Sequence, residues 1–167
     1  MLLTSKDANK MLKQLNEELN SLQRNEDNSM RFVAATIENK EDVRPDYDYK
    51  DMRKKMDELE RKIIRLKHAI NLFNTRTIVP GFDMTIDEML IYIPQLYAKK
   101  LKLSHMKDYP KMERTLPQYS TNLINYTYIN FDTDEVQEDY RKTDDELSKA
   151  QIALDKINVS ETFEVEV

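Results

Sequence analysis

The sequence has no cysteine and only one glycine, Gly81, among its 167 residues. Without cysteine the chain offers no disulfide, no thiol nucleophile and no thiolate metal ligand. Glycine-rich phosphate-binding loops need several glycines, because backbone amides must approach the phosphates closely. The P-loop and the dinucleotide-binding fingerprint are therefore excluded.

Long apolar runs are also missing. The longest uncharged apolar run is 89–93, far shorter than the roughly 20 residues of a membrane-spanning helix. The first residues become polar at Thr4, too early for the apolar region of a signal peptide. We therefore predict no membrane insertion and a cytoplasmic location, which the lack of cysteine suits. The net charge of −5 gives no overall attraction to nucleic acid or anionic lipid.

Residues for catalysis or metal binding are few. The two histidines are His68 and His105, and a metal site needs three or four converging ligands. Neither histidine lies three residues after a glutamate, as in di-iron helical bundles. The carboxylates gather in 132–139 and 144–146, where their spacing is typical of a solvated helix surface. We therefore predict a protein that is not an enzyme and binds neither a metal nor a cofactor.

The feature that the sequence does contain is a heptad repeat. Eight apolar residues follow one another at alternating spacings of three and four: Tyr49, Met52, Met56, Leu59, Ile63, Leu66, Ile70 and Phe73. Such spacing is typical of helices that pack against other helices. It predicts a helix over about 47–75, with an apolar seam about 37 Å long at about 1.5 Å per residue.

Periodicity and capping signals predict three further helices, over about 4–24, 85–106 and 133–158. Thr85 and Glu88 form a capping box at the start of 85–106. Residues rich in β-branched and aromatic side chains, or alternating in polarity, predict short strands over about 31–37, 123–131 and 162–167. The segment 108–122 contains two prolines, so we expect it to be irregular.

The charges beside the apolar stripes suggest which helices are neighbours. The flanks of 47–75 are mostly basic and those of 133–158 are acidic, so we predict that these two helices are neighbours, within one chain or across a dimer. The predicted fold is mainly α, a single domain over 1–167. In it, a long antiparallel helical hairpin of 47–75 and 85–106 lies in a four-helix, coiled-coil-like bundle with a small β-sheet element.

A second apolar stripe follows the later half of the helix over 47–75. Ile64, His68 and Leu72 recur at every fourth residue, on a face away from the main seam. A helix with two apolar stripes is usually covered on two sides. These residues are therefore a candidate interface, and we expect a homo-oligomer.

The end of the same helix carries an unusual polar group that includes Asn71, Asn74 and Arg76. One interpretation is capping, in which side chains satisfy the last carbonyls and Arg76 faces the negative end of the helix dipole. The other is a polar site that binds a ligand or sets subunit register. A ligand-binding bundle, or an enzyme, would use this site.

A local basic segment over 97–114 contains Lys99, Lys100 and Lys102 together with tyrosines. Lysines interleaved with aromatic residues can contact nucleic acid. The other interpretation is that this segment faces an acidic patch of the same assembly. Nucleic-acid binding is therefore an alternative function, which substitution of these lysines by glutamate would test.

Two stretches resemble a bacterial family described as septicolysin-like. The resembling residues are 67–71, Asn74, Thr77 and 80–88 in the centre of the chain, and 145–147, Gln151, 154–155 and Asn158 near its end. The resemblance covers most of 47–106 and 132–167, and it implies a small helical protein of a family without an established activity. The haemolysin that the family name implies receives little support, because the chain has no membrane-spanning element.

These observations together predict a non-enzymatic, self-associating structural or interaction module. The seam of the helix over 47–75 and its second stripe would be buried in the oligomer. The alternatives are nucleic-acid binding through 97–114 and ligand binding or catalysis near Asn71 and Arg76.

Overall fold

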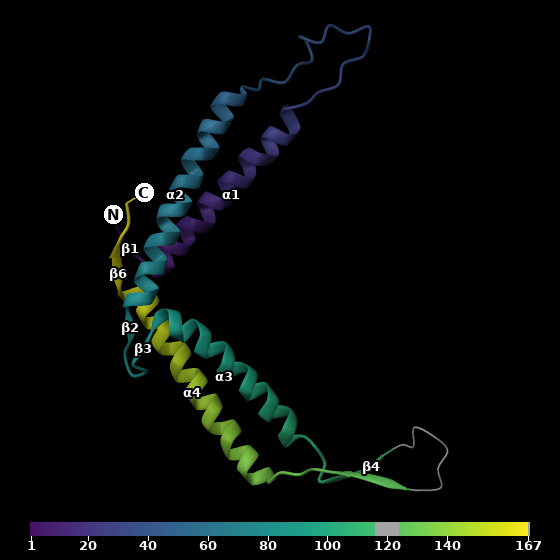
Figure 1. Cartoon of the computed structure of the whole chain (residues 1–167), viewed down its shortest axis with the longest axis vertical. Coiled ribbons are helices and arrows are strands. Elements are labelled where there is room, and N and C mark those ends of the chain that lie inside the picture. The colour runs from purple at the N-terminus through teal and green to yellow at the C-terminus, as the bar shows by residue number, and fades with distance from the viewer. Residues whose placement is uncertain (116–123, 167) are drawn as a thin grey trace. The chain divides into compact units, whose positions relative to one another are not determined.

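The computed structural model describes residues 1–115 and 124–166 (Figure 1). The protein is mainly α, with about 65% of the described residues helical and with small antiparallel sheets, as the sequence predicts. Its internal contacts group the chain into two compact units, whereas the sequence analysis treats 1–167 as one domain. Unit 1 is Met1–Thr77 with Lys156–Val167, and unit 2 is Ile78–Asp155.

Unit 1 consists of two long helices and a two-stranded sheet. The helices are α1 (Ser5–Ser29) and α2 (Tyr49–Arg76), and they lie side by side (Figure 1). The sheet pairs β1 (Leu2–Thr4) with β6 (Thr162–Glu164) in antiparallel fashion. The end of α4 (Thr133–Ser160) leads into β6. The predicted strand at 162–167 is thus confirmed for its first three residues, and Val167 lies outside the described residues.

Side chains mark where the helices of unit 1 begin. The hydroxyl oxygen of Thr4 accepts a hydrogen bond from the amide of Asp7 at 3.1 Å, and Asp48 caps α2 in the same manner. These contacts satisfy amides that have no partner within the helix. Helix α1 ends at Ser29, five residues beyond the prediction. Glu26 explains the extension, because it accepts hydrogen bonds from the Tyr47 hydroxyl at 2.9 Å and from the Arg53 guanidinium.

The predicted seam of α2 forms the core of unit 1. Its buried residues are Met56, Leu59, Ile63, Leu66, Ile70 and Phe73, whereas Tyr49 is exposed. The apolar stripe of α1, which includes Ala8 and Leu15, shares one apolar cluster with four of them: Leu59, Ile63, Leu66 and Ile70. The prediction of a buried seam is therefore correct. Within unit 1 the helix that covers it is α1, which the sequence did not predict as the neighbour of α2.

The expected strand at 31–37 is also wrong. Residues 30–48 are all described, and they form turns and extended coil between α1 and α2. Val33 and Ile37 are exposed, and the guanidinium of Arg44 lies 5.5 Å from the ring centre of Phe32. β-branched residues favour a strand only where a neighbouring strand satisfies the backbone and covers one face.

Unit 2 begins with a tight hairpin of β2 (Ile78–Val79) and β3 (Met84–Thr85). Gly81 has a φ of 87° at this turn, a conformation that glycine adopts without steric cost. Helix α3 (Ile86–Lys107) follows, and both hydrogen bonds of the predicted capping box between Thr85 and Glu88 are present. The capping prediction is therefore confirmed.

Helices α3 and α4 are antiparallel neighbours in unit 2 (Figure 1). The ammonium of Lys100 donates a hydrogen bond to Asp144 at 2.5 Å, and the Tyr92 hydroxyl donates to Glu146. Nearer the end of α3, the Lys107 ammonium lies 4.4 Å from the ring centre of Tyr140. The acidic flank of α4 thus pairs with α3 within unit 2, whereas the sequence predicts the helix over 47–75 as its neighbour, within one chain or across a dimer.

A β-ribbon connects α3 to α4. It pairs β4 (Met112–Thr115) with β5 (Asn125–Tyr128) in antiparallel register. The strand predicted at 123–131 is confirmed for Asn125–Tyr128, and Leu123 lies outside the described residues. Residues 112–115, expected to be irregular, are a strand. Pro110 precedes β4, where a proline does not interrupt the ladder. The rest of the expected irregular segment, 116–122, lies outside the described residues.

Substitution of Ile63 by alanine should lower the free energy of unfolding by about 2–4 kcal/mol, because it removes a buried side chain and leaves a cavity. Ile37→Ala is the matched control, since Ile37 is 95% exposed in the same unit, and it should change stability by less than about 0.5 kcal/mol. Urea unfolding followed by circular dichroism measures both. Equal losses would contradict the assignment of the core.

The hydrogen bond between Tyr92 and Glu146 should make stability depend on alkaline pH. This bond raises the pKa of Tyr92 above 10.0, because the phenol must lose its proton, and the bond, on ionisation. A pKa that is higher in the folded than in the unfolded state adds to the free energy of unfolding. The full contribution is present at pH values below the unfolded-state pKa, and it is lost as the pH rises through the folded-state pKa. Tyr92→Phe should therefore be less stable than the parent chain at pH 8, and the difference should shrink at pH 11. Tyr109→Phe, at an exposed ring, is the control.

Candidate interaction groove

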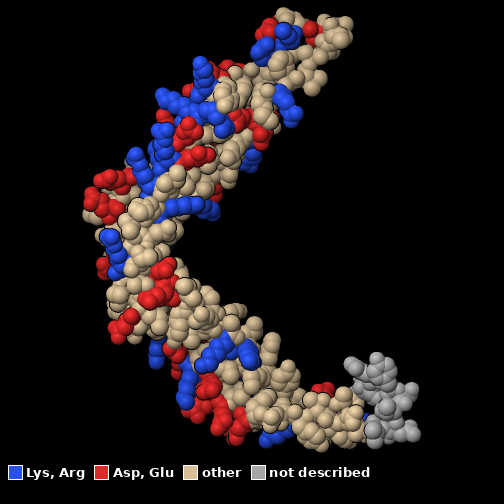
Figure 2. All heavy atoms as spheres, in the orientation of Figure 1, with Lys and Arg blue, Asp and Glu red and all other residues tan. Residues whose placement is uncertain are grey.

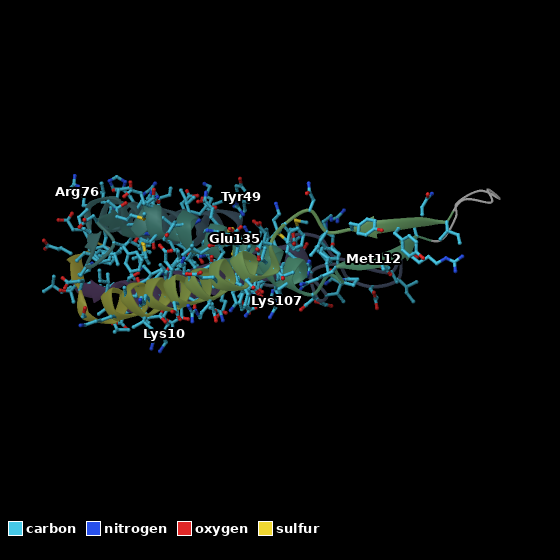
Figure 3. All side chains as sticks on the ribbon, turned by 90° about the horizontal axis from the view of Figure 1, so that it is seen from below. Lys10, Tyr49, Arg76, Lys107, Met112 and Glu135 are labelled. Atoms are coloured by element: carbon cyan, nitrogen blue, oxygen red, sulfur yellow. The ribbon has the colours of Figure 1, made fainter. Side chains whose placement is uncertain are left out.

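An open groove lies in unit 1, between the C-terminal half of α2 and the chain end that contains β6. Its volume is about 640 Å³. Its lining residues are Arg65, His68, Ala69, Leu72, Phe73, Arg76, Thr77, Phe163, Glu164 and Glu166. Figure 3 labels Arg76 at this end of α2 and Tyr49 at the opposite end.

Two stacked aromatic rings form the floor of the groove. The ring centres of Phe73 and Phe163 are 4.5 Å apart, with an angle of 22° between the planes. The sheet holds Phe163 in place, because Phe163 pairs with Leu3 of β1, and the amide of Val165 donates to the Met1 carbonyl at 2.8 Å. A stacked pair adds about 0.5–1.5 kcal/mol beyond the burial of its area. The groove therefore has an apolar base of two stacked rings, one of which is anchored by the sheet.

The walls of the groove carry charges of both signs. Arg65 and Arg76 come from α2 together with His68, and Glu164 and Glu166 come from the opposite wall. The two carboxylates point outward because Phe163 and Val165, the alternate residues of the strand, face inward. A groove with both signs suits a protein surface, which also carries both. Phosphates would be attracted by one wall and repelled by the other.

The groove joins two of the predicted sites. His68 and Leu72 of the second stripe and Arg76 of the polar group all line it. Ile64 lies on α2 one turn before His68, with 66% of its surface exposed, and Leu72 is 37% exposed. The stripe is therefore an uncovered face of α2 within its own unit, and it leads into the groove.

The polar group at the end of α2 also shows the contacts of a helix cap. The Thr75 hydroxyl donates to the carbonyl of Asn71 at 3.0 Å, and the Thr77 amide donates to the Phe73 carbonyl at 3.0 Å. Asn71 is exposed, and Asn74 has a buried Oδ1 without a hydrogen-bond partner among the described residues. Among the three residues of the predicted polar site, only Arg76 lines the groove.

The structure brings part of the predicted basic segment onto an acidic helix of the same unit. Lys100 binds Asp144, and this hydrogen bond raises the pKa of Lys100 above 10.5. Lys99 and Lys102 are exposed. Figure 2 shows acidic side chains gathered over the first half of α4. This arrangement supports the interpretation that the segment faces an acidic patch of the protein itself.

The described residues contain neither a metal-binding cluster nor a membrane-spanning helix. In 1–115 and 124–166, no three or more His, Cys, Asp or Glu side chains come together in a way that would hold a metal ion. In the same residues, no helix combines the length and the apolar character needed to cross a bilayer.

The end of the chain contributes to the groove residues that were not predicted from the sequence as part of a site. Phe163, Glu164 and Glu166 supply half of the floor and one wall. The alternation of 162–167 predicts that Phe163 is on the covered face of a strand. The alternation does not identify the element that covers Phe163, because periodicity is a local property of the sequence.

Comparisons with known proteins show the fold alone. The sequence matches no protein-family model and no curated protein. The structure is similar to a crystal structure of a functionally unknown conserved protein from Corynebacterium diphtheriae, with a TM-score of 0.62 and 14% sequence identity. The match covers 98% of this chain and 100% of the other.

Substitution of Phe163 by alanine should lower the free energy of unfolding by about 1–3 kcal/mol, because the stacked ring of Phe73 loses its partner. Phe163→Leu should recover part of this loss, since leucine refills much of the volume. Phe32→Ala is the control, at a loop aromatic of the same unit. Urea unfolding measures all three, and a loss for Phe32→Ala as large as that for Phe163→Ala would contradict the structural role of the stack.

Proposed function

We propose that the protein is a cytoplasmic, non-enzymatic module that acts by associating with copies of itself. The contact surface is the groove together with the stripe of Ile64, His68 and Leu72. One observation carries this proposal: an exposed apolar face of α2 runs directly into a groove with an aromatic floor. Apolar surface that is continuous in this manner is typical of interaction sites, whereas single exposed apolar residues are ordinary.

The charges of the groove support a protein partner in preference to a small substrate. Among the described residues, the lining contains no serine or cysteine, which are the usual nucleophiles of hydrolases. The opposed walls of arginines and glutamates match a surface that also carries both signs, and a second copy of this chain provides one.

The resemblance to the septicolysin-like family belongs to the same proposal. Residues 67–71, Asn74 and Thr77 carry part of that resemblance, and three of these residues, His68, Ala69 and Thr77, line the groove. We therefore propose that members of the family share this surface and the self-association that it supports.

In light scattering, the parent protein should have a mass above the 19.9 kDa of one chain. Ile64→Glu and Leu72→Glu should each lower this mass. Each glutamate would be desolvated in the contact, which should weaken association at this surface by about tenfold or more.

Val33→Glu is the matched control, because Val33 is 93% exposed in the loop of the same unit. It should leave the mass unchanged. A parent chain that is a monomer at every concentration, or variants that keep the parent mass, would refute the proposal.

A further inference from the structure

Helix α3 is apolar on two sides. One side contains its buried residues, Ile86, Met89, Leu96 and Leu103. Lys100, which binds Asp144 of α4, lies on this same side. The second side is exposed and is formed by Leu90, Pro94, Tyr97 and Leu101. Leu90 and Leu101 are each 50% exposed, and Tyr97 is 60% exposed. We call these four residues the α3 stripe.

The α3 stripe is continuous and has the spacing of a helix-packing seam. Its residues follow one another at intervals of four, three and four, as the a and d positions of a heptad do. Ile91 and Ala98 are exposed beside it, and much of the visible surface along α3 is uncharged (Figure 2). A helix that is apolar on more than one side is usually covered on each of them.

The spacing of the α3 stripe is the same when it is counted from either end. Its midpoint lies between Gln95 and Leu96. If a second copy were placed antiparallel about a two-fold axis at this point, Leu90 would lie opposite Leu101 of the second copy. Pro94 would lie opposite Tyr97 in the same way. A self-complementary surface of this kind is what a two-fold symmetric contact requires.

The charges at the two ends of α3 favour the antiparallel direction. The first turn is acidic, with Asp87 and Glu88, and the last turn is basic, with His105 and Lys107. An antiparallel pair places each acidic turn beside a basic turn, and it does so twice. A parallel pair would place like charges together, and it would also align the two helix dipoles unfavourably.

We propose that the α3 stripe binds the α3 stripe of a second copy in an antiparallel, two-fold symmetric pair. This inference deepens the proposed function, because it rests on self-association, but it uses a different surface in a different unit. A chain with two separate contact surfaces can build assemblies larger than a dimer.

A mixture of two single-cysteine variants tests the pairing, since the parent chain has no cysteine. Leu90→Cys and Leu101→Cys are oxidised separately and together. In the antiparallel pair the two different variants bring their cysteines opposite each other. Two copies of the same variant keep their cysteines about 16 Å apart along the helix, beyond the reach of a disulfide. The mixed disulfide should therefore exceed either symmetric one by about tenfold.

Controls separate this contact from random collision and from misfolding. Leu90→Cys mixed with Ile152→Cys, at an exposed position of α4, should give no preferred product. Tyr97→Glu, introduced into both cysteine variants, should abolish the preference, and circular dichroism should show that helix content is retained. A preferred symmetric disulfide, or equal yields in all mixtures, would overturn the antiparallel pairing.

The same experiment in the Ile64→Glu background distinguishes the two surfaces. If the mixed disulfide keeps its preference there, the α3 contact stands whether or not the groove mediates association. If Ile64→Glu lowers the mass of the parent assembly but no mixture shows a preference, the groove contact stands and the α3 pairing is overturned.

Discussion

The apolar contact between α1 and the seam of α2 is the interaction on which unit 1 depends. Four large side chains of α2 are buried in the cluster with α1, and full burial of each stabilises the fold by about 1.5–3 kcal/mol. Because this contact orients α2, it also decides which of its faces remain exposed. The contacts of Glu26 with Tyr47 and Arg53 then close the far end of the helical pair.

The exposed faces of α2 are where the candidate site forms. The stripe that begins at Ile64 lies off the seam, so α1 leaves it uncovered. The sheet of β1 and β6 covers the end of the core and brings Phe163 onto Phe73. The groove is therefore a consequence of incomplete coverage: the helix has more apolar surface than its neighbours in the unit bury.

Unit 2 follows the same physical logic with different contacts. Helices α3 and α4 are joined by polar and charged pairs as well as by buried residues, and α3 keeps a second apolar side exposed. In each unit one helix carries two apolar stripes and its partner covers one of them. This remaining apolar surface is the physical basis of the proposed self-association.

Local patterns in the sequence predict the four helices, the capping box of α3, the buried seam of α2 and the start of the final strand, because periodicity and capping depend on residues within a few positions of one another. Which helix covers which is a property of the folded chain alone. A heptad seam requires burial without naming a partner, and flank charges that contribute about 0.2–1 kcal/mol each are too weak to choose one against the packing of whole helices. Contacts between distant segments also explain the other differences. Residues 31–37 have no neighbouring strand and form a loop, and the sheet of β1 and β6 places the ring of Phe163 beside Phe73. The exposed side of α3 is defined by the fact that α4 covers the other side.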